Sequence, residues 1–151
     1  MPGLGKRLRP GWRMSENKAF IDTSALLRFL VKDDPAKAKA VERLLKESKD
    51  KGITLYVLPV TILEIVWVTE KVYRLSRKSI KELVEAILNT PELKCPLEHV
   101  FRQALITYEA QRIKFADAVM AHWGLEEGLS TVYTYDDKDF KKISGLQVRK
   151  P

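Results

Sequence analysis

Four acidic side chains stand where the surrounding sequence gives little reason for a charge. Glu64 lies in the run 62–68, whose other six residues are hydrophobic, so this part of a predicted helix has no polar face. Asp22 and Asp136 each end a strand-like hydrophobic run, and Asp117 lies in the first turn of another predicted helix. A buried carboxylate is strongly destabilising unless it is protonated or binds a cation. These four acids are therefore the candidates for a chemical site.

Strands and helices alternate along the chain. The hydrophobic pattern predicts strands at 19–21, 53–58, 93–97, 131–135 and 146–148. It predicts helices at 25–31, 35–48, 59–73, 76–88, 98–111 and 115–127, with a loop and a short helix between 136 and 143. This alternation predicts an α/β fold, with a mainly parallel sheet of four to five strands and helices on both of its faces.

The fold explains how distant acids can meet. In a parallel α/β sheet, the carboxyl ends of the strands and the amino ends of the following helices share one edge, where such sheets bind ligands. All four acids are at strand ends or in early helical turns, so they can converge there. At ~4 Å and an effective dielectric near 20, each like-charged pair would cost about 4 kcal/mol. Either some of the carboxyl groups are protonated or a divalent cation compensates them.

The donor type indicates which cation that would be. Oxygen ligands without a nearby Cys or His suit Mg²⁺ or Mn²⁺ rather than Zn²⁺. Such sites usually serve phosphate chemistry: one ion or two would activate a water and stabilise charge on the attacking and leaving oxygens. Ordinary explanations remain open for three of the acids, since Asp22 and Asp136 suit caps or turns and Asp117 suits a helix amino terminus. Glu64 has no such explanation.

Length and composition narrow the class of protein. The chain has 151 residues, the length of one domain, and 45% of them are hydrophobic and 31% charged, as in globular proteins. It lacks an apolar run of ~20 residues, which argues against a membrane span. A single cysteine, Cys95, excludes an internal disulfide framework and a Cys-based zinc site. We expect a cytoplasmic protein.

The net charge of +7 is concentrated near the amino terminus. Residues 1–18 carry five basic side chains against Glu16, a balance of +4, and the remainder is close to neutral. We predict a basic, flexible leader over residues 1–17 and a single domain over residues 18–151. Such a leader can bind nucleic-acid phosphates or be unstructured, and Met14 is an alternative start that would remove residues 1–13.

Four segments together resemble the PIN domain and, more narrowly, the VapC-type toxins of prokaryotic toxin–antitoxin pairs. They are residues 20–27 (FIDTSALL), 61–68 (TILEIVWV), 115–118 (FADA) and 134–136 (TYD), the last followed by Asp139-Phe140. Each motif alone is weak, but their order and spacing over about residues 18–150 are more specific. The resemblance implies a three-layer α/β/α sandwich and a Mg²⁺- or Mn²⁺-dependent endoribonuclease that hydrolyses RNA phosphodiester bonds. It also implies a homodimer and a small antitoxin partner.

The resemblance assigns roles to particular residues. It makes Asp22, Glu64, Asp117 and Asp136 the catalytic and metal-binding acids, with Ser24 in support. Asp136 is preferred to Asp137 because it directly follows Thr134-Tyr135, and Asp137 and Asp139 are possible supporting residues. Arg112 and Lys114, close to Asp117 in the sequence, are candidate contacts for RNA phosphates. The leader is longer than such toxins usually carry.

Other polar residues have simpler interpretations. The basic residues of the segment 71–81 form a solvated face or, alternatively, a rim that binds the RNA backbone. Trp67 and Trp123 are predicted core residues, and His99 and His122 ordinary helix residues.

Three rival functions stay open. One is a PIN-fold nuclease in RNA processing or DNA repair, and another is a non-catalytic scaffold that binds RNA or protein. The third, a phosphate-transferring enzyme with an aspartyl nucleophile, typically needs a second acid two residues after the first, where this chain has Ser24.

Overall fold

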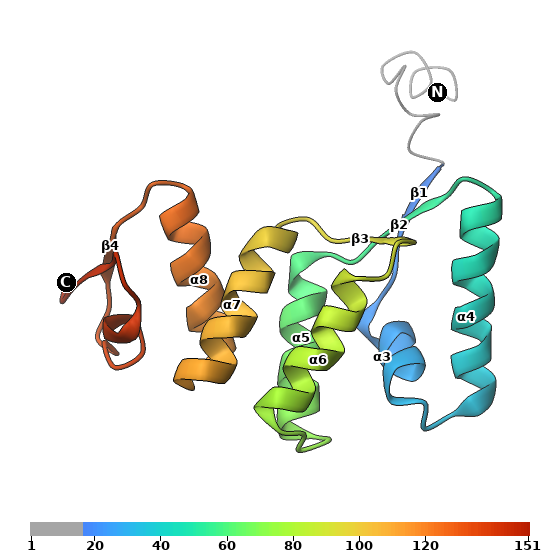
Figure 1. Ribbon diagram of the computed structural model, residues 1–151, viewed down its shortest axis with the longest axis horizontal. Coiled ribbons are helices and arrows are strands. Elements are labelled where there is room, and N and C mark those ends of the chain that lie inside the picture. Colours follow the sequence, from blue (N-terminus) through green and yellow to red (C-terminus); the bar gives the residue numbers. More distant parts are fainter. Residues whose placement is uncertain (1–16) are drawn as a thin grey trace, which may run out of the picture. The chain divides into compact units, whose positions relative to one another are not determined.

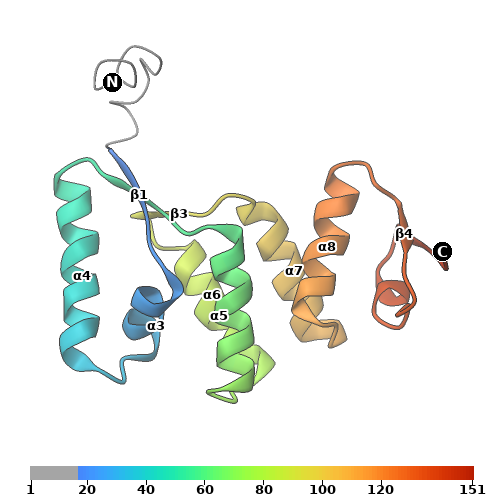
Figure 2. The ribbon, with the colours of Figure 1, turned by 180° about the vertical axis from the view of Figure 1, so that it is seen from behind.

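The computed structural model describes residues 17–151. The predicted basic leader therefore lies outside the described residues, apart from Asn17. The described chain forms two compact units, and each is treated by itself: the first runs to Ile62 and includes Ile87–Pro96, and the second comprises Leu63–Ala86 and Leu97–Pro151. Figures 1 and 2 show the elements of both units from two opposite sides. The predicted single domain over residues 18–151 stays a prediction.

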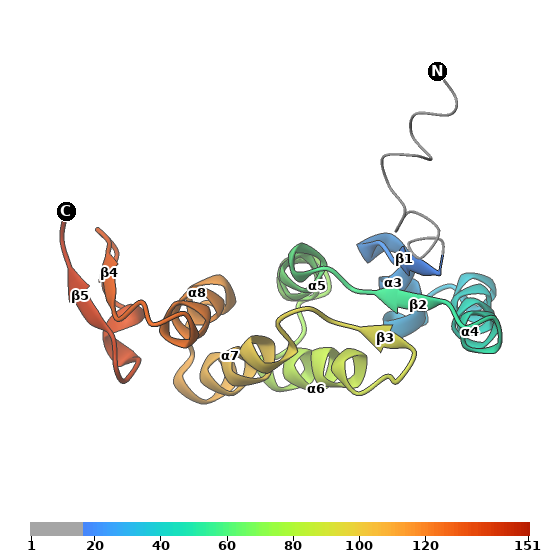
Figure 3. The ribbon, with the colours of Figure 1, turned by 90° about the horizontal axis from the view of Figure 1, so that it is seen from above.

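The first unit is built on a parallel sheet of three strands. β1 (Lys18–Phe20), β2 (Thr54–Tyr56) and β3 (Leu93–Lys94) lie side by side in that order, as Figure 3 shows. Leu55 pairs with Ala19 on one side and with Leu93 on the other. The sheet is extended past the strand ends by the Ile21 N–H, which donates to the Tyr56 carbonyl at 2.9 Å. β3 is shorter than the strand predicted over 93–97 and ends before Pro96, which has no N–H to donate to a sheet.

Two helices complete the first unit. α3 (Thr23–Val31) follows β1 after two residues, and α4 (Pro35–Asp50) packs against both α3 and β2. Asp34 caps α4: its Oδ1 accepts from the Lys37 N–H at 3.2 Å, and Pro35 occupies the first turn, where a missing N–H costs nothing. The buried residues of α4 recur every three or four positions, so one face packs inward: Ala38, Val41, Leu45 and Ser48.

The second unit joins four helices to a small parallel ribbon. Helices α5 (Pro59–Lys71) and α6 (Arg77–Leu88) contribute residues to both units. α7 (Glu98–Gln111) packs against α8 (Phe115–Glu126), and Phe115 contacts Phe101 and Tyr108 with ring centroids 6.2 and 5.6 Å away. The strands β4 (Thr131–Tyr133) and β5 (Gln147–Arg149) pair in parallel, with the 3₁₀ helix η1 (Phe140–Lys142) between them.

The predicted α/β class and parallel pairing are confirmed. The described residues contain five strands, within the expected number, and every ladder is parallel. The strands are hydrogen-bonded as one sheet of three and one of two, where the sequence predicted a single sheet. The alternation of helices and strands is consistent with a three-layer α/β/α sandwich. No helix in the described part of the chain is both long and apolar enough to span a membrane.

Arg77 differs from its basic neighbours in the segment 71–81. Its Nη1 donates to the carbonyl oxygens of Tyr108 and Ile113, both at 2.8 Å, and its guanidinium lies 4.4 Å from the Tyr108 ring centroid. The Tyr108 hydroxyl in turn donates to Glu70 Oε2 at 2.7 Å. The favoured interpretation of this segment as a solvated face is therefore wrong for Arg77, which joins the start of α6 to the end of α7.

A partly buried histidine of α8, His122, makes the free energy of unfolding depend on pH. His122 Nε2 is 2.7 Å from the Thr107 hydroxyl, and burial lowers the pKa of this imidazole. The unfolded chain binds the proton more readily, so the free energy of unfolding will fall as pH drops below about 6.5. Urea unfolding of the wild type and of His122→Gln between about pH 7 and pH 5 measures this effect. Most carboxylates titrate below this pH range, so they contribute little to the difference.

The matched control for this pH dependence is the second histidine. His99 is exposed, so His99→Gln should keep the wild-type slope whereas His122→Gln flattens it. Equal slopes in the wild type and His122→Gln would contradict the prediction.

Candidate active site

Asp117 borders a hollow in the second unit. The side chain is in the first turn of α8, which begins after Lys114. The hollow has a volume of about 270 Å³, and its lining includes Lys114, Asp117, Met120, Tyr133, Asp136 and Phe140. It thus combines residues from the start of α8, from β4 and from the loop that follows β4. Two of the four predicted acids, Asp117 and Asp136, line it together.

A third carboxylate lies beside Asp117. Asp139 is only 8% exposed, and its Oδ2 accepts from the Lys114 backbone N–H at 3.0 Å. The Asp139 carboxyl group also contributes to the raised pKa of Asp117. Asp139, predicted as a possible supporting residue, is therefore a direct neighbour of Asp117.

The charges in the hollow act on Asp117 in opposite directions. Burial is the main reason that the pKa of Asp117 is raised, followed by the negative charge of Asp139 and, more weakly, that of Asp136. Lys114 opposes this shift, and its Nζ lies 3.6 Å from Asp136 Oδ2. The negative charge on Asp117 is thus compensated only in part.

Asp136 and Asp137 have different surroundings. Asp136 lines the hollow, and its N–H donates to the Thr134 hydroxyl at 2.9 Å. Asp137 instead pairs with Lys141 at 2.7 Å, and this hydrogen bond lowers the pKa of Asp137. Of these two residues, Asp136 lines the hollow and Asp137 does not; the choice of Asp136 as the fourth acid stays a prediction.

Asp22 belongs to the first unit and caps α3. Its Oδ2 accepts from the Ser24 hydroxyl at 2.9 Å and from the Ser24 N–H at 3.3 Å. The side-chain hydrogen bond with Ser24 is the main reason that the pKa of Asp22 is lowered. The carboxylate is exposed and ionised at neutral pH, so it can serve as a metal ligand while it caps the helix. Ser24, predicted as a supporting residue, orients it.

Glu64 is exposed on α5, so the expectation that it has little access to water is wrong. The same face carries Val60 and Trp67, each 59% exposed. The predicted core position of Trp67 is therefore also wrong, and so is that of Trp123, which is 42% exposed. The helix is apolar almost all round, but its packed side is defined by Ile62, Ile65, Val66 and Thr69.

The predicted RNA contacts lie just before α8. Arg112 is exposed and ends α7 in a left-handed conformation with φ 56°. Lys114 is exposed at its ammonium group and anchored through its backbone to Asp139. Met120 and Tyr133 are exposed and also line the hollow, although neither was predicted as a site residue. The sequence pattern placed Met120 on the inner face of its helix, which is wrong, and Tyr133 in a strand.

The carboxylates of the hollow fit a hard divalent cation by donor type. They supply only oxygen ligands. Burial and then repulsion from Asp139 raise the pKa of Asp117, and a bound cation would relieve the repulsion. Within residues 17–151, however, no three acidic, His or Cys side chains are already grouped as a metal site. Binding would therefore require the acidic side chains to move closer together around the ion.

Two comparisons place the chain among known proteins. Residues 19–146 match the family model of the PIN domain. The chain is 30% identical over 123 residues to a VapC ribonuclease of Aquifex aeolicus (strain VF5), which covers 82% of this chain and 90% of that protein. No solved structure matches the chain significantly.

Proposed function

This chain belongs to the PIN-domain family, and from that premise we propose that it is a divalent-metal-dependent endoribonuclease, the toxin of a toxin–antitoxin pair. The match to the PIN model and the identity with a VapC ribonuclease confirm the resemblance to PIN domains of the VapC type. They support a nuclease activity. The observation that carries the finer proposal is that Asp117 and Asp136 line one hollow, where Lys114 pairs with Asp136 and Asp139 lies beside Asp117.

The carboxylates of the hollow would hold one or two Mg²⁺ or Mn²⁺ ions through Asp117 and Asp136. When bound, such ions stabilise negative charge on a phosphate that is being hydrolysed. A water oxygen would bond to phosphorus while a carboxylate takes the water proton. The phosphorus–oxygen bond to ribose would break, and the leaving ribose oxygen would take a proton from solvent. Lys114 and Asp136 are both exposed, so the ion pair between them leaves the Lys114 ammonium group accessible to a phosphate oxygen.

Asp22 and Glu64 enter the proposal through their motifs. Both match acidic positions of the family, and both side chains are exposed and accessible to a cation. An exposed aspartate is ionised at neutral pH, as a metal ligand requires, and the hydrogen bond from Ser24 lowers the pKa of Asp22 further. We assign both residues to the same reaction as Asp117 and Asp136, with Arg112 as a further contact for the RNA backbone.

Removal of the metal tests the proposal. The purified chain will cut one or a few discrete positions in a panel of structured RNAs with Mg²⁺ or Mn²⁺, and not at all with EDTA. Excess Mg²⁺ should restore the cut. Product analysis by primer extension locates it. Undiminished cleavage in EDTA would contradict the metal dependence.

A modified substrate identifies the nucleophile. If water attacks, an RNA with a single 2′-deoxy nucleotide at the mapped position will still be cut, because the 2′ hydroxyl takes no part in the reaction. The attack would instead be assigned to the 2′ hydroxyl by two results together. The 2′-deoxy RNA would no longer be cut, and the unmodified RNA would give a 2′,3′-cyclic phosphate product. Cutting of a matched DNA but not of RNA would favour a role in DNA repair.

The remaining proposals concern partners and place of action. We propose a homodimer, a small antitoxin protein as partner, and action in the cytoplasm, where RNA is available. The exposed side chains of Val60 and Trp67, which lie on one face of α5, support a protein interface, since exposed apolar patches are commonly covered by partners. Sedimentation of the purified chain measures the oligomeric state.

A further inference from the structure

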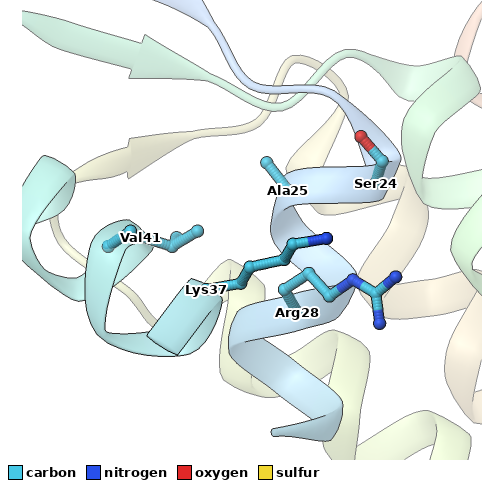
Figure 4. Close-up of a pocket in the computed structure, with 6 residues that line it drawn as sticks. Ser24, Ala25, Arg28, Lys37 and Val41 are labelled. Carbon is cyan, nitrogen blue, oxygen red and sulfur yellow. The ribbon is translucent and has the colours of Figure 1, made fainter. Parts of the chain in front are cut away.

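A second hollow lies in the first unit, between α3 and α4. Its volume is about 360 Å³, and it is lined by Ser24, Ala25, Arg28, Lys37, Ala40 and Val41. Three of the lining residues are apolar: Ala25, Ala40 and Val41. Figure 4 shows Arg28 reaching out from α3 and Lys37 from α4, with their charged ends directed to the same side. Two cations from different helices thus border one apolar recess.

Both cations have an acidic neighbour outside the lining. Arg28 Nη1 contacts both carboxylate oxygens of Asp33 at 3.2 Å, and Lys37 Nζ lies 3.9 Å from Asp34 Oδ2. All four side chains are partly exposed, so these ion pairs are weak. A guanidinium carries five N–H donors, so Arg28 can bind a phosphate while Nη1 keeps Asp33. The pairs therefore orient the cations without occupying them fully.

The recess adjoins a proposed catalytic residue. Ser24 lines it, and the hydroxyl of Ser24 donates to Asp22 Oδ2 at 2.9 Å. Arg28 is one helical turn beyond Ser24 on α3, on the same side of the helix. A group held by Arg28 and Lys37 would consequently lie within a short reach of the Asp22 carboxylate.

We propose that this recess binds a nucleotide of the RNA substrate next to the bond that is cut. Arg28 and Lys37 bind its phosphate, and Ala25, Ala40 and Val41 contact its ribose and base. This role rests on the proposed ribonuclease function and adds a positioning site to it. A single phosphate matches two cations at the edge of an apolar surface. An acidic peptide would bring several negative charges next to Asp33 and Asp34, which would repel them.

Removal of the Lys37 charge tests the recess. Binding of a short single-stranded RNA to the full chain is measured in EDTA, which prevents cutting, at several salt concentrations. For Lys37→Ala we expect affinity to fall about five-fold and the salt slope to fall by about 0.7, the loss of one phosphate contact. Lys39→Ala is the matched control, since Lys39 is an exposed α4 lysine outside the recess. It should bind as the wild type does.

Cleavage kinetics separate this site from the chemistry. In Mg²⁺, Lys37→Ala should raise KM about five-fold and leave kcat within about two-fold, because the contact is made before and during reaction. If the wild type cuts RNA but Lys37→Ala and Lys39→Ala behave alike, the recess proposal is overturned and the nuclease stands. If the wild type cuts no RNA, the proposed ribonuclease function is wrong. The RNA-binding measurement then still tests whether the recess binds RNA.

A polyglutamate peptide tests the competing occupant of the recess, an acidic peptide. It should bind the wild type and Lys37→Ala equally weakly. Affinity for polyglutamate that falls in Lys37→Ala while RNA affinity stays unchanged would assign the recess to an acidic protein partner and overturn the proposal.

Discussion

Asp117→Asn will reduce RNA cleavage by about a hundred- to a thousand-fold and leave the free energy of unfolding unchanged or slightly higher. Asparagine has the shape of aspartate but lacks the charge that would bind a cation or take a proton. The effect on stability has the opposite sign to that of a structural residue. Burial and the neighbouring Asp139 raise the pKa of Asp117, so ionised Asp117 opposes folding at neutral pH.

Two measurements on the same variant check this. Discontinuous RNA cleavage assays in Mg²⁺ give the rate, and urea unfolding gives the stability. Glu126→Gln, at the exposed carboxyl end of the same helix, is the matched control and should cut RNA at the wild-type rate. A stable Asp117→Asn protein with unchanged cleavage would remove Asp117 from the proposed reaction. A loss of both activity and stability would indicate a structural role.

Arg77→Ala will lower the free energy of unfolding by about 3 kcal/mol. The side chain donates to two carbonyls, those of Tyr108 and Ile113, and both residues are fully buried. Without Arg77, each buried carbonyl loses a charged donor, at a cost of about 1–3 kcal/mol per unsatisfied group. Loss of the contact with the Tyr108 ring adds roughly 0.5–2 kcal/mol, and such terms are not fully additive.

Urea unfolding also measures the effect at Arg77. Arg77→Lys should fall between the wild type and Arg77→Ala, because lysine keeps the charge but not the planar group that stacks on Tyr108. The neighbouring Lys78 is exposed, so Lys78→Ala should change stability by less than about 0.5 kcal/mol. Equal stabilities for Arg77→Ala and Lys78→Ala would show that the network contributes nothing.

Local signals in the sequence were sufficient to predict the start of the first unit. A hydrophobic strand followed by Asp22-Thr23-Ser24 predicted a strand end and a helix cap, and the structure has Asp22 as the cap of α3. Pro35 likewise marked the first turn of α4. These features depend on residues within three or four positions of each other, so a short window of sequence contains the whole cause.

The orientation of α5 could not be predicted in the same way. Its sequence is apolar on nearly every side, so its own residues do not define which face packs inward. The structure leaves Glu64 and Trp67 exposed because Ile62, Ile65 and Val66 take the packed positions. That choice depends on neighbouring elements, which lie far away in the sequence.

The sequence identified residues of the candidate site, but it did not identify the contacts between them. Asp117 and Asp136 were identified as site acids, and they line the same hollow. The bond from the Lys114 N–H to Asp139 spans 25 positions, and those from Arg77 span 31 and 36. No local pattern indicates such partners, so Asp139 was given only a supporting role and Arg77 was grouped with solvent-facing residues.

The anchoring of Arg77 determines how a scan of this basic segment has to be interpreted. Neutralising Lys71, Lys78 or Lys81 changes the surface charge, whereas neutralising Arg77 also loosens the end of α7, a few residues before Lys114 and Asp117. Weaker RNA retention by an Arg77 variant would then report partial unfolding at the edge of the active centre. Only thermal melts run in parallel would separate that artefact from a true loss of electrostatic attraction.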